Sequence, residues 1–146
     1  MERGKQSKWL TEKGIKMRHS GMPLEIEAVG RAAVDAGLKV HAALGPGLLE
    51  SAYAHCLFYE LEHRGIVVRR EAAVPITYDG KALDAGFRID LLLAEKVILE
   101  IKSVDALGPI HQAQLLTYLR LSGCRLGYLM NFNVELFKHG LRRIVL

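Results

Sequence analysis

The sequence contains little cysteine and no long uninterrupted hydrophobic segment. Its two cysteines, Cys56 and Cys124, do not form a CxxC pair, so neither a disulfide framework nor a structural zinc site is expected. Both lie among apolar residues and are expected in the core. No apolar run is long enough to cross a bilayer, and none follows the basic N-terminus, so neither a transmembrane helix nor a secretory signal is predicted. These absences favour a cytoplasmic protein with no membrane partner.

The sequence also lacks a charge surplus outside its first 22 residues. Residues 1–22 hold six basic and two acidic residues, which accounts for the whole net charge of +4, and the rest holds 14 of each sign. Because residues 1–22 have no apolar periodicity, we predict that they form a disordered basic tail or an upstream extension. A single domain is then expected at 23–146. A neutral domain gives only weak support for nucleic-acid binding by global charge.

Hydrophobic periodicity predicts two helices, four strands, a third helix and two final strands, in that order. This order indicates a mixed α/β (α+β) fold with a central mixed sheet flanked by helices. Glycine, proline and Asp-Gly signals separate the elements. The helices are expected from about Glu25 to Leu44, Leu48 to Arg64 and Pro109 to Ser122.

The segment VILEIKSVD, residues 97–105, ends a strand-like run with a carboxylate and an ammonium group. Alternate strand residues share a face, so Glu100 and Lys102 are expected to point the same way. If the preceding turn is centred on Glu95, Asp90 lies across from Glu100, with Cβ atoms about 5 Å apart. Two carboxylates at that distance repel each other, and a divalent cation between them removes the repulsion.

Carboxylate oxygens, with water and a substrate phosphate, suit Mg²⁺ or Mn²⁺. Such an ion can lower the pKa of a bound water and stabilise charge on a phosphate, and Lys102 beside it can orient the water. The alternative is a polar strand end, with Glu100 and Lys102 solvated at a sheet edge and Asp90 in a turn.

Two helical patterns carry further candidate residues. In GLLESAY, residues 47–53, Glu50 and Tyr53 share one helical stripe; the alternative is a first-turn glutamate favoured by the helix dipole. Gln114 and Tyr118 share a face at i, i+4 and could hydrogen-bond a water or phosphate, and His111 could join them. The alternative for this second helix is an amphipathic helix with a polar edge.

These residues together resemble the GxxExxY protein family, over residues 24 to 146. That family resembles a branch of the PD-(D/E)XK nuclease superfamily, which implies a restriction-endonuclease-like core. The resemblance implies that Asp90 and Glu100 are metal ligands and Lys102 the catalytic lysine. It also implies roles for the Ile101 backbone carbonyl as a metal ligand, for Glu50 as an extra acidic ligand, and for Gln114 and Tyr118 as a QxxxY motif.

The leading hypothesis is therefore a nuclease that depends on Mg²⁺ (or Mn²⁺) and hydrolyses phosphodiester bonds, with DNA as the expected substrate. Asp90, Glu100 and Lys102 are its predicted catalytic residues, and the predicted substrate-positioning residues are Gln114, Tyr118 and Tyr53. The alternative is a catalytically silent module of the same fold that binds nucleic acid or a protein partner. A homodimer or a larger assembly, in which a partner supplies a basic surface, is a further hypothesis.

Overall fold

The computed structural model describes residues 21–146, so the predicted basic tail lies almost entirely outside the described part of the chain. Two residues assigned to that tail are described: Gly21 is exposed, whereas Met22 is 1% exposed and packs in the core. Met22 therefore contributes its side chain to the folded unit, and the division into a tail and a single domain stays a prediction.

Three α-helices occupy the described residues: α1 (Leu24–Leu44), α2 (Glu50–His63) and α3 (Pro109–Ser122). Their bounds lie within two residues of the predicted ones. Gly45 and Gly47 adopt positive φ angles of 66° and 103° after α1, a conformation that glycine tolerates and that ends a helix. Within residues 21–146, no helix is long and apolar enough to cross a membrane.

Five strands form one mixed sheet in the order β1-β4-β5-β6-β7. Only the β5–β6 pair is parallel, since α3 crosses between these two strands; the other neighbours are antiparallel. The strand bounds are β1 (Val68–Ala73), β4 (Arg88–Leu93), β5 (Val97–Lys102), β6 (Leu126–Asn131) and β7 (Leu141–Val145). A short 3₁₀ helix, η1 (Phe137–Gly140), precedes β7.

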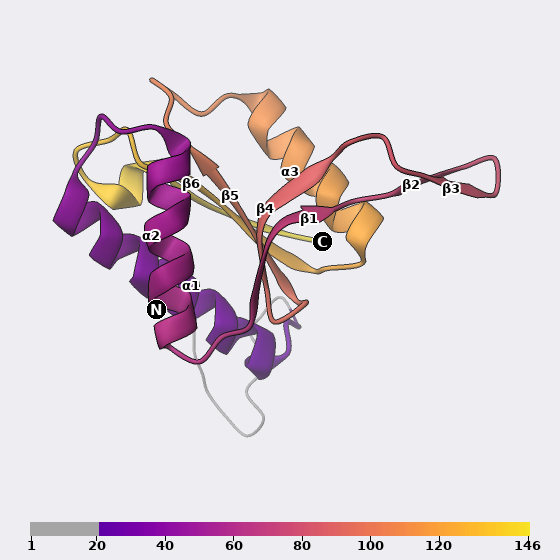
Figure 1. Cartoon of the computed structure of the whole chain (residues 1–146), viewed down its shortest axis with the longest axis horizontal. Coiled ribbons are helices and arrows are strands. Elements are labelled where there is room, and N and C mark those ends of the chain that lie inside the picture. The colour runs from indigo at the N-terminus through magenta and orange to yellow at the C-terminus, as the bar shows by residue number, and fades with distance from the viewer. Residues whose placement is uncertain (1–20) are drawn as a thin grey trace.

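Between α2 and α3 the chain forms five strands where four were predicted. Two of the five form a small hairpin, β2 (Ile76–Tyr78) and β3 (Lys81–Leu83), which turns at Asp79 and Gly80 as the Asp-Gly signal indicates. Both turn residues have positive φ, 52° and 75°, as a two-residue hairpin turn requires. Figure 1 shows this hairpin projecting from the body of the molecule.

The helices cover both faces of the sheet, with α1 and α2 on one side and α3 on the other (Figure 1). Each side has its own hydrophobic cluster. Leu91, Leu99 and Ile101 pack with α1 and α2, whereas Ile89 and Ile98 pack with α3. The sheet is therefore a buried central layer, and polar side chains on its strands need local partners.

Candidate active site

The β4–β5 ladder stops at the point where the acidic residues begin. The register pairs Leu91 with Leu99, Leu92 with Ile98 and Leu93 with Val97, which is the register predicted from a turn centred on Glu95. The next two residues, Asp90 and Glu100, are not paired through this backbone register. The two strands separate here, at one end of a buried sheet.

Side chains bridge the gap between the separated strands. Glu100 Oε2 accepts a hydrogen bond from the Asp90 backbone N–H at 2.9 Å. Asp90 Oδ2 accepts one from the Ile101 backbone N–H at 2.8 Å. Each carboxylate thus reaches across to the opposite strand, and the structure brings Asp90 and Glu100 together at the same point.

Two strands change the face that they bury at this point. In β4, Ile89 packs on the α3 side and Leu91 on the α1–α2 side, although residues two apart normally share a face. In β1, Val68 and Ala72 differ in the same way, and Glu71 between them has a positive φ of 51°. The resulting irregularity turns the Glu71 and Asp90 side chains toward one cavity.

Burial and nearby negative charge disfavour the charged form of both bridging carboxyl groups. Glu100 is only 3% exposed, and burial, with the Asp90 charge as the second cause, raises its pKa to about 8. Burial also raises the pKa of Asp90, against the hydrogen bond from Ile101 and the charge of Lys102, which lower it. The pair is short of positive charge, so a cation would be stabilised here.

The donor set fits a hard divalent cation that keeps water or substrate ligands. Within residues 21–146, no protein donor hydrogen-bonds to Asp90 Oδ1 or Glu100 Oε1, so both oxygens are available as ligands. No group of three or more His, Cys, Asp or Glu side chains in that range is arranged to hold a metal ion. Asp90 and Glu100 are thus the two carboxylates here that could bind a cation, with water and phosphate completing its shell.

Lys102, at the end of β5, faces α3, which carries the predicted residues Gln114 and Tyr118. Lys102 Nζ donates to Gln114 Oε1 at 3.5 Å, which links β5 to α3. Tyr118, one turn further along α3, is 5% exposed. Burial raises the pKa of Tyr118, and the charges of Glu100 and Asp90 raise it further. Tyr118 is therefore near enough to both carboxylates to interact with them electrostatically.

Glu50 lies at the first residue of α2 and lines a cavity of 210 Å³ that Asp90 and Ile101 also line. Its Oε2 accepts a hydrogen bond from the Ser103 backbone N–H at 3.2 Å, and the Ser103 hydroxyl donates to the Leu48 carbonyl at 2.7 Å. Residue 103, directly after the catalytic lysine predicted at 102, therefore anchors the start of α2 beside the strand end.

Tyr53 occupies a different place from the one predicted. Its side chain is fully buried, stacks on Phe132 at 4.4 Å between ring centroids, and donates its hydroxyl hydrogen to the Gly45 carbonyl. The hydroxyl also accepts from the Leu48 N–H. Tyr53 cannot contact a substrate from this position. It holds the turn that leads into α2 and so supports the position of Glu50.

Two polar residues near the site carry no sequence signal that would have identified them. Glu71 lines the 210 Å³ cavity, and its charge contributes to raising the pKa of Asp90. Asn131, 2% exposed at the end of β6, bonds both the N–H and the carbonyl of Val104 and so fixes the loop after β5. Both positions depend on strand pairings between segments far apart in the sequence.

Comparison with known protein families matches residues 27–144 to the PD-(D/E)XK nuclease superfamily. No curated protein and no solved structure matches the chain. In the described residues, the three helices and the five-stranded mixed sheet are consistent with the restriction-endonuclease-like core that was predicted. Membership of the GxxExxY family stays a prediction, and at the level the match supports, the chain belongs to the PD-(D/E)XK nuclease superfamily.

Proposed function

We propose that the protein is a metal-dependent nuclease that hydrolyses phosphodiester bonds in DNA. The observation that carries this proposal is the crossed pair of carboxylates at the divergence of β4 and β5, with Asp90 and Glu100 each bonded to the opposite strand. Such a pair, buried and short of positive charge, suits a divalent cation. Nucleases of this superfamily generally use divalent metals, in agreement with this interpretation.

Asp90, Glu100 and the Ile101 carbonyl would hold Mg²⁺ or Mn²⁺, with Glu50 at the edge of the same cavity. When bound, the cation would activate water and offset negative charge on the phosphate. Lys102, tethered by Gln114, would orient the attacking water and stabilise the charge that develops on the phosphate oxygens. Gln114 and Tyr118 would position the substrate strand from α3.

A digestion panel tests the proposal. Purified protein would be incubated with plasmid, linear duplex, single-stranded DNA and RNA, in Mg²⁺, in Mn²⁺ and in EDTA. We expect metal-dependent cleavage of DNA by the wild type and none by Asp90→Asn. Equal cleavage by both proteins, or cleavage that persists in EDTA, would contradict the proposed mechanism.

The second candidate is a catalytically silent module of the same fold that binds nucleic acid or a protein. The balance of 14 basic and 14 acidic residues after residue 22 favours it, because the domain has no surplus of cations to grip phosphates. The retained acid pair opposes it, since a binder of anions gains nothing from buried carboxylates. Calorimetric titration with Mn²⁺ separates the two, because only the nuclease requires the cation.

A further inference from the structure

A groove extends from the candidate active site along the exposed side of α2. Ser51 lines both the 210 Å³ site cavity and a neighbouring cavity of 630 Å³. His55 and Arg70 line that second cavity and also a third one, of 530 Å³. Because each cavity shares lining residues with the next, the three lie side by side along α2, next to β1, and are together called the groove.

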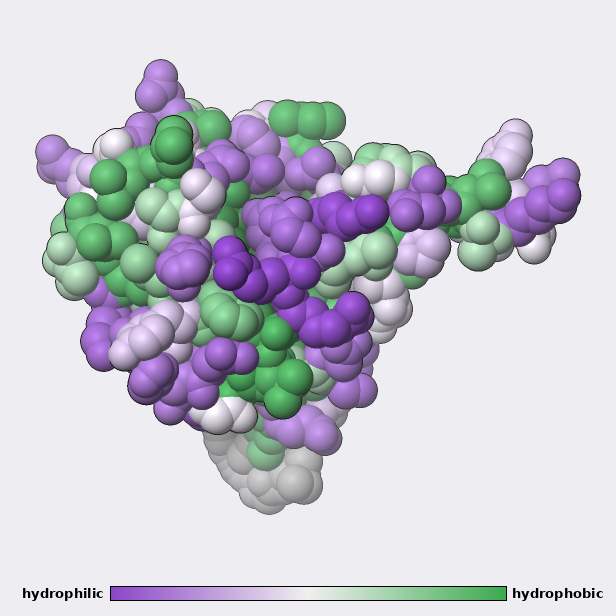
Figure 2. Space-filling view, in the orientation of Figure 1, coloured by the Kyte–Doolittle hydropathy of each residue, from purple (hydrophilic) through white to green (hydrophobic). Residues whose placement is uncertain are grey.

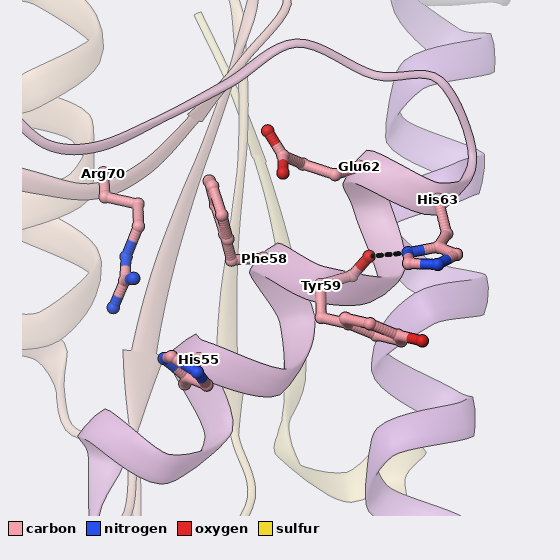
Figure 3. Close-up of a pocket in the computed structure, with 6 residues that line it drawn as sticks. All are labelled: His55, Phe58, Tyr59, Glu62, His63 and Arg70. Atoms are coloured by element: carbon pink, nitrogen blue, oxygen red, sulfur yellow. Dashed lines mark hydrogen bonds between the residues drawn. The ribbon is translucent and has the colours of Figure 1, made fainter.

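The far part of this groove combines a cation, Arg70, and a carboxylate, Glu62, with exposed aromatic rings (Figure 3). The Arg70 guanidinium lies 5.1 Å from the centroid of the Phe58 ring, a cation–π distance. Tyr59 is 57% exposed, and its ring lies 4.0 Å from that of His63. A hydrogen bond of 3.0 Å between the His63 ring and the Tyr59 carbonyl holds His63 in place. The rings are thus ordered but open to solvent.

The same backbone irregularity serves the site and the groove. Successive residues of a strand normally point to opposite faces, yet Arg70 lines the groove and Glu71 lines the site cavity, and α2 residues line both. The positive φ of Glu71 accounts for this arrangement. One strained residue therefore places a carboxylate at the site and leaves a cation beside it.

We propose that this groove binds a single-stranded nucleic-acid segment next to the bond that is cut, an inference that rests on the proposed function. Arg70 contacts a phosphate, with His55 beside it, and Tyr59 stacks on a base. Ser51 and Tyr59 are eight residues apart on α2, which is about 12 Å along the helix, enough for a segment of a few nucleotides.

A single strand fits these groups better than a duplex or a protein. Stacking on Tyr59 needs a base whose face is free, which paired and stacked duplex bases do not offer. A protein partner would be expected to bind a more apolar surface. The exposed Leu48 and Leu49 line only the 630 Å³ cavity in the middle of the groove. The part beyond it is lined by polar and charged side chains besides its rings, and hydrophilic residues cross the middle of the face shown in Figure 2.

Binding of a fluorescein-labelled 12-nucleotide oligothymidine, measured by anisotropy in EDTA, tests the proposal without cleavage. We expect Tyr59→Ala to raise Kd about tenfold. Arg70→Gln should raise Kd and reduce the slope of log K against log salt by about 0.7, the value for one single-strand phosphate contact. The matched controls are Tyr78→Ala, on the hairpin, and Arg69→Gln, on the same strand and ion-paired with Glu95; both should bind as the wild type does.

Kd values within twofold of the wild type for both Tyr59→Ala and Arg70→Gln would overturn the proposal. So would a blunt duplex of the same length that binds as tightly and loses as much affinity in both variants. A change in self-association of the variants by light scattering, with unchanged oligothymidine binding, would also overturn it in favour of a protein interface. Failure of the nuclease function is a separate result, because it appears as a lack of Mg²⁺-dependent cleavage while variant-sensitive binding in EDTA persists.

Discussion

Lys102 and the two carboxylates are neighbours, but their loss should have different consequences. Lys102 is not a predicted metal ligand, so Lys102→Ala should leave Mn²⁺ affinity unchanged while lowering the cleavage rate by about 10²–10³-fold, the usual cost of losing one charge-stabilising group. Calorimetry and single-turnover cleavage measure the two quantities. Lys96→Ala, in the exposed β4–β5 turn, is the matched control. Cleavage by Lys102→Ala at the wild-type rate would remove Lys102 from the mechanism.

The raised pKa of Glu100 predicts a pH dependence for the metal-free protein. The folded protein keeps the Glu100 proton up to about pH 8, whereas the unfolded chain releases it near 4.5. The stability that this proton contributes is complete below pH 4.5 and is lost as the pH rises through 8. Between these limits the expected slope is about 1.4 kcal/mol per pH unit. Urea unfolding in EDTA at pH 5, 6.5 and 8 measures it.

Glu100→Gln should flatten this dependence, because the amide is neutral throughout and its oxygen can still accept the Asp90 N–H. At pH 8 in EDTA the variant should therefore be more stable than the wild type. The exposed Glu95→Gln is the control and should follow the wild-type curve. Parallel curves for wild type and Glu100→Gln would show that Glu100 ionises normally in the folded protein.

At the scale of the secondary-structure elements, β1 contains a strained residue, Glu71. The effect of its backbone strain on stability can be measured separately from the effect of its charge. A non-glycine residue at positive φ costs about 1–2 kcal/mol, so both Glu71→Gly and Asp79→Gly should raise the free energy of unfolding. Their φ angles are nearly equal, 51° and 52°. Of the two, only Glu71 contributes to raising the pKa values of Asp90 and Glu100.

The gain from Glu71→Gly should therefore exceed that from Asp79→Gly by more at pH 8, where Glu100 ionises, than at pH 5. Urea midpoints of the metal-free proteins provide the comparison. An excess gain that is the same at both pH values would mean that Glu71 does not act on the site through its charge.

The junction of β6 and η1 depends on close backbone packing that supports the site loop. A Cβ atom at Gly140 would lie within clash distance of the Asn131 carbonyl oxygen, and the Asn131 side chain holds Val104. Gly140→Ala should lower the free energy of unfolding by about 1–3 kcal/mol. Gly108→Ala is the control, because nothing lies within 4 Å of its added Cβ. Equal unfolding free energies for the two variants would contradict this account.

At the scale of the whole molecule, the positive charge belongs to the first residues and the folded body is neutral. Residues 1–20 hold six basic and two acidic side chains, and the rest of the chain is balanced. A chain that begins at Gly21 should therefore bind duplex DNA with a shallower salt dependence than the full chain, since fewer counterions are released. Titrations of both forms between about 50 and 200 mM salt measure the slopes. Identical slopes would mean that residues 1–20 make no phosphate contacts.

A homodimer remains a prediction at this scale. A small neutral domain offers little surface for contact with a long duplex, so a second copy or another partner would enlarge that surface. Size-exclusion chromatography with light scattering on the full chain measures the mass directly. A strictly monomeric protein that cleaves duplex DNA would show that no second copy is needed.

Sequence alone was sufficient wherever the determining interactions are local. The bounds of α3 follow from Pro109 and Gly123, and the β4–β5 register follows from a short turn, because a hairpin leaves few alternative pairings. That register is what brings Asp90 and Glu100 to the same strand end. The metal-ligand hypothesis for these two residues therefore rests on information from the single hairpin that contains them both.

Tertiary structure alone decided the parts that depend on distant segments. Tyr53 shares a motif with Glu50, but packing against Phe132 places its ring in the core. Glu71 reaches the site cavity only because β1 pairs with β4 and is distorted there. Met22 belongs to the core because α1 and the sheet meet around it. The local sequence pattern predicts which residues share a face of a helix or strand. Whether that face is buried depends on which other elements pack against it.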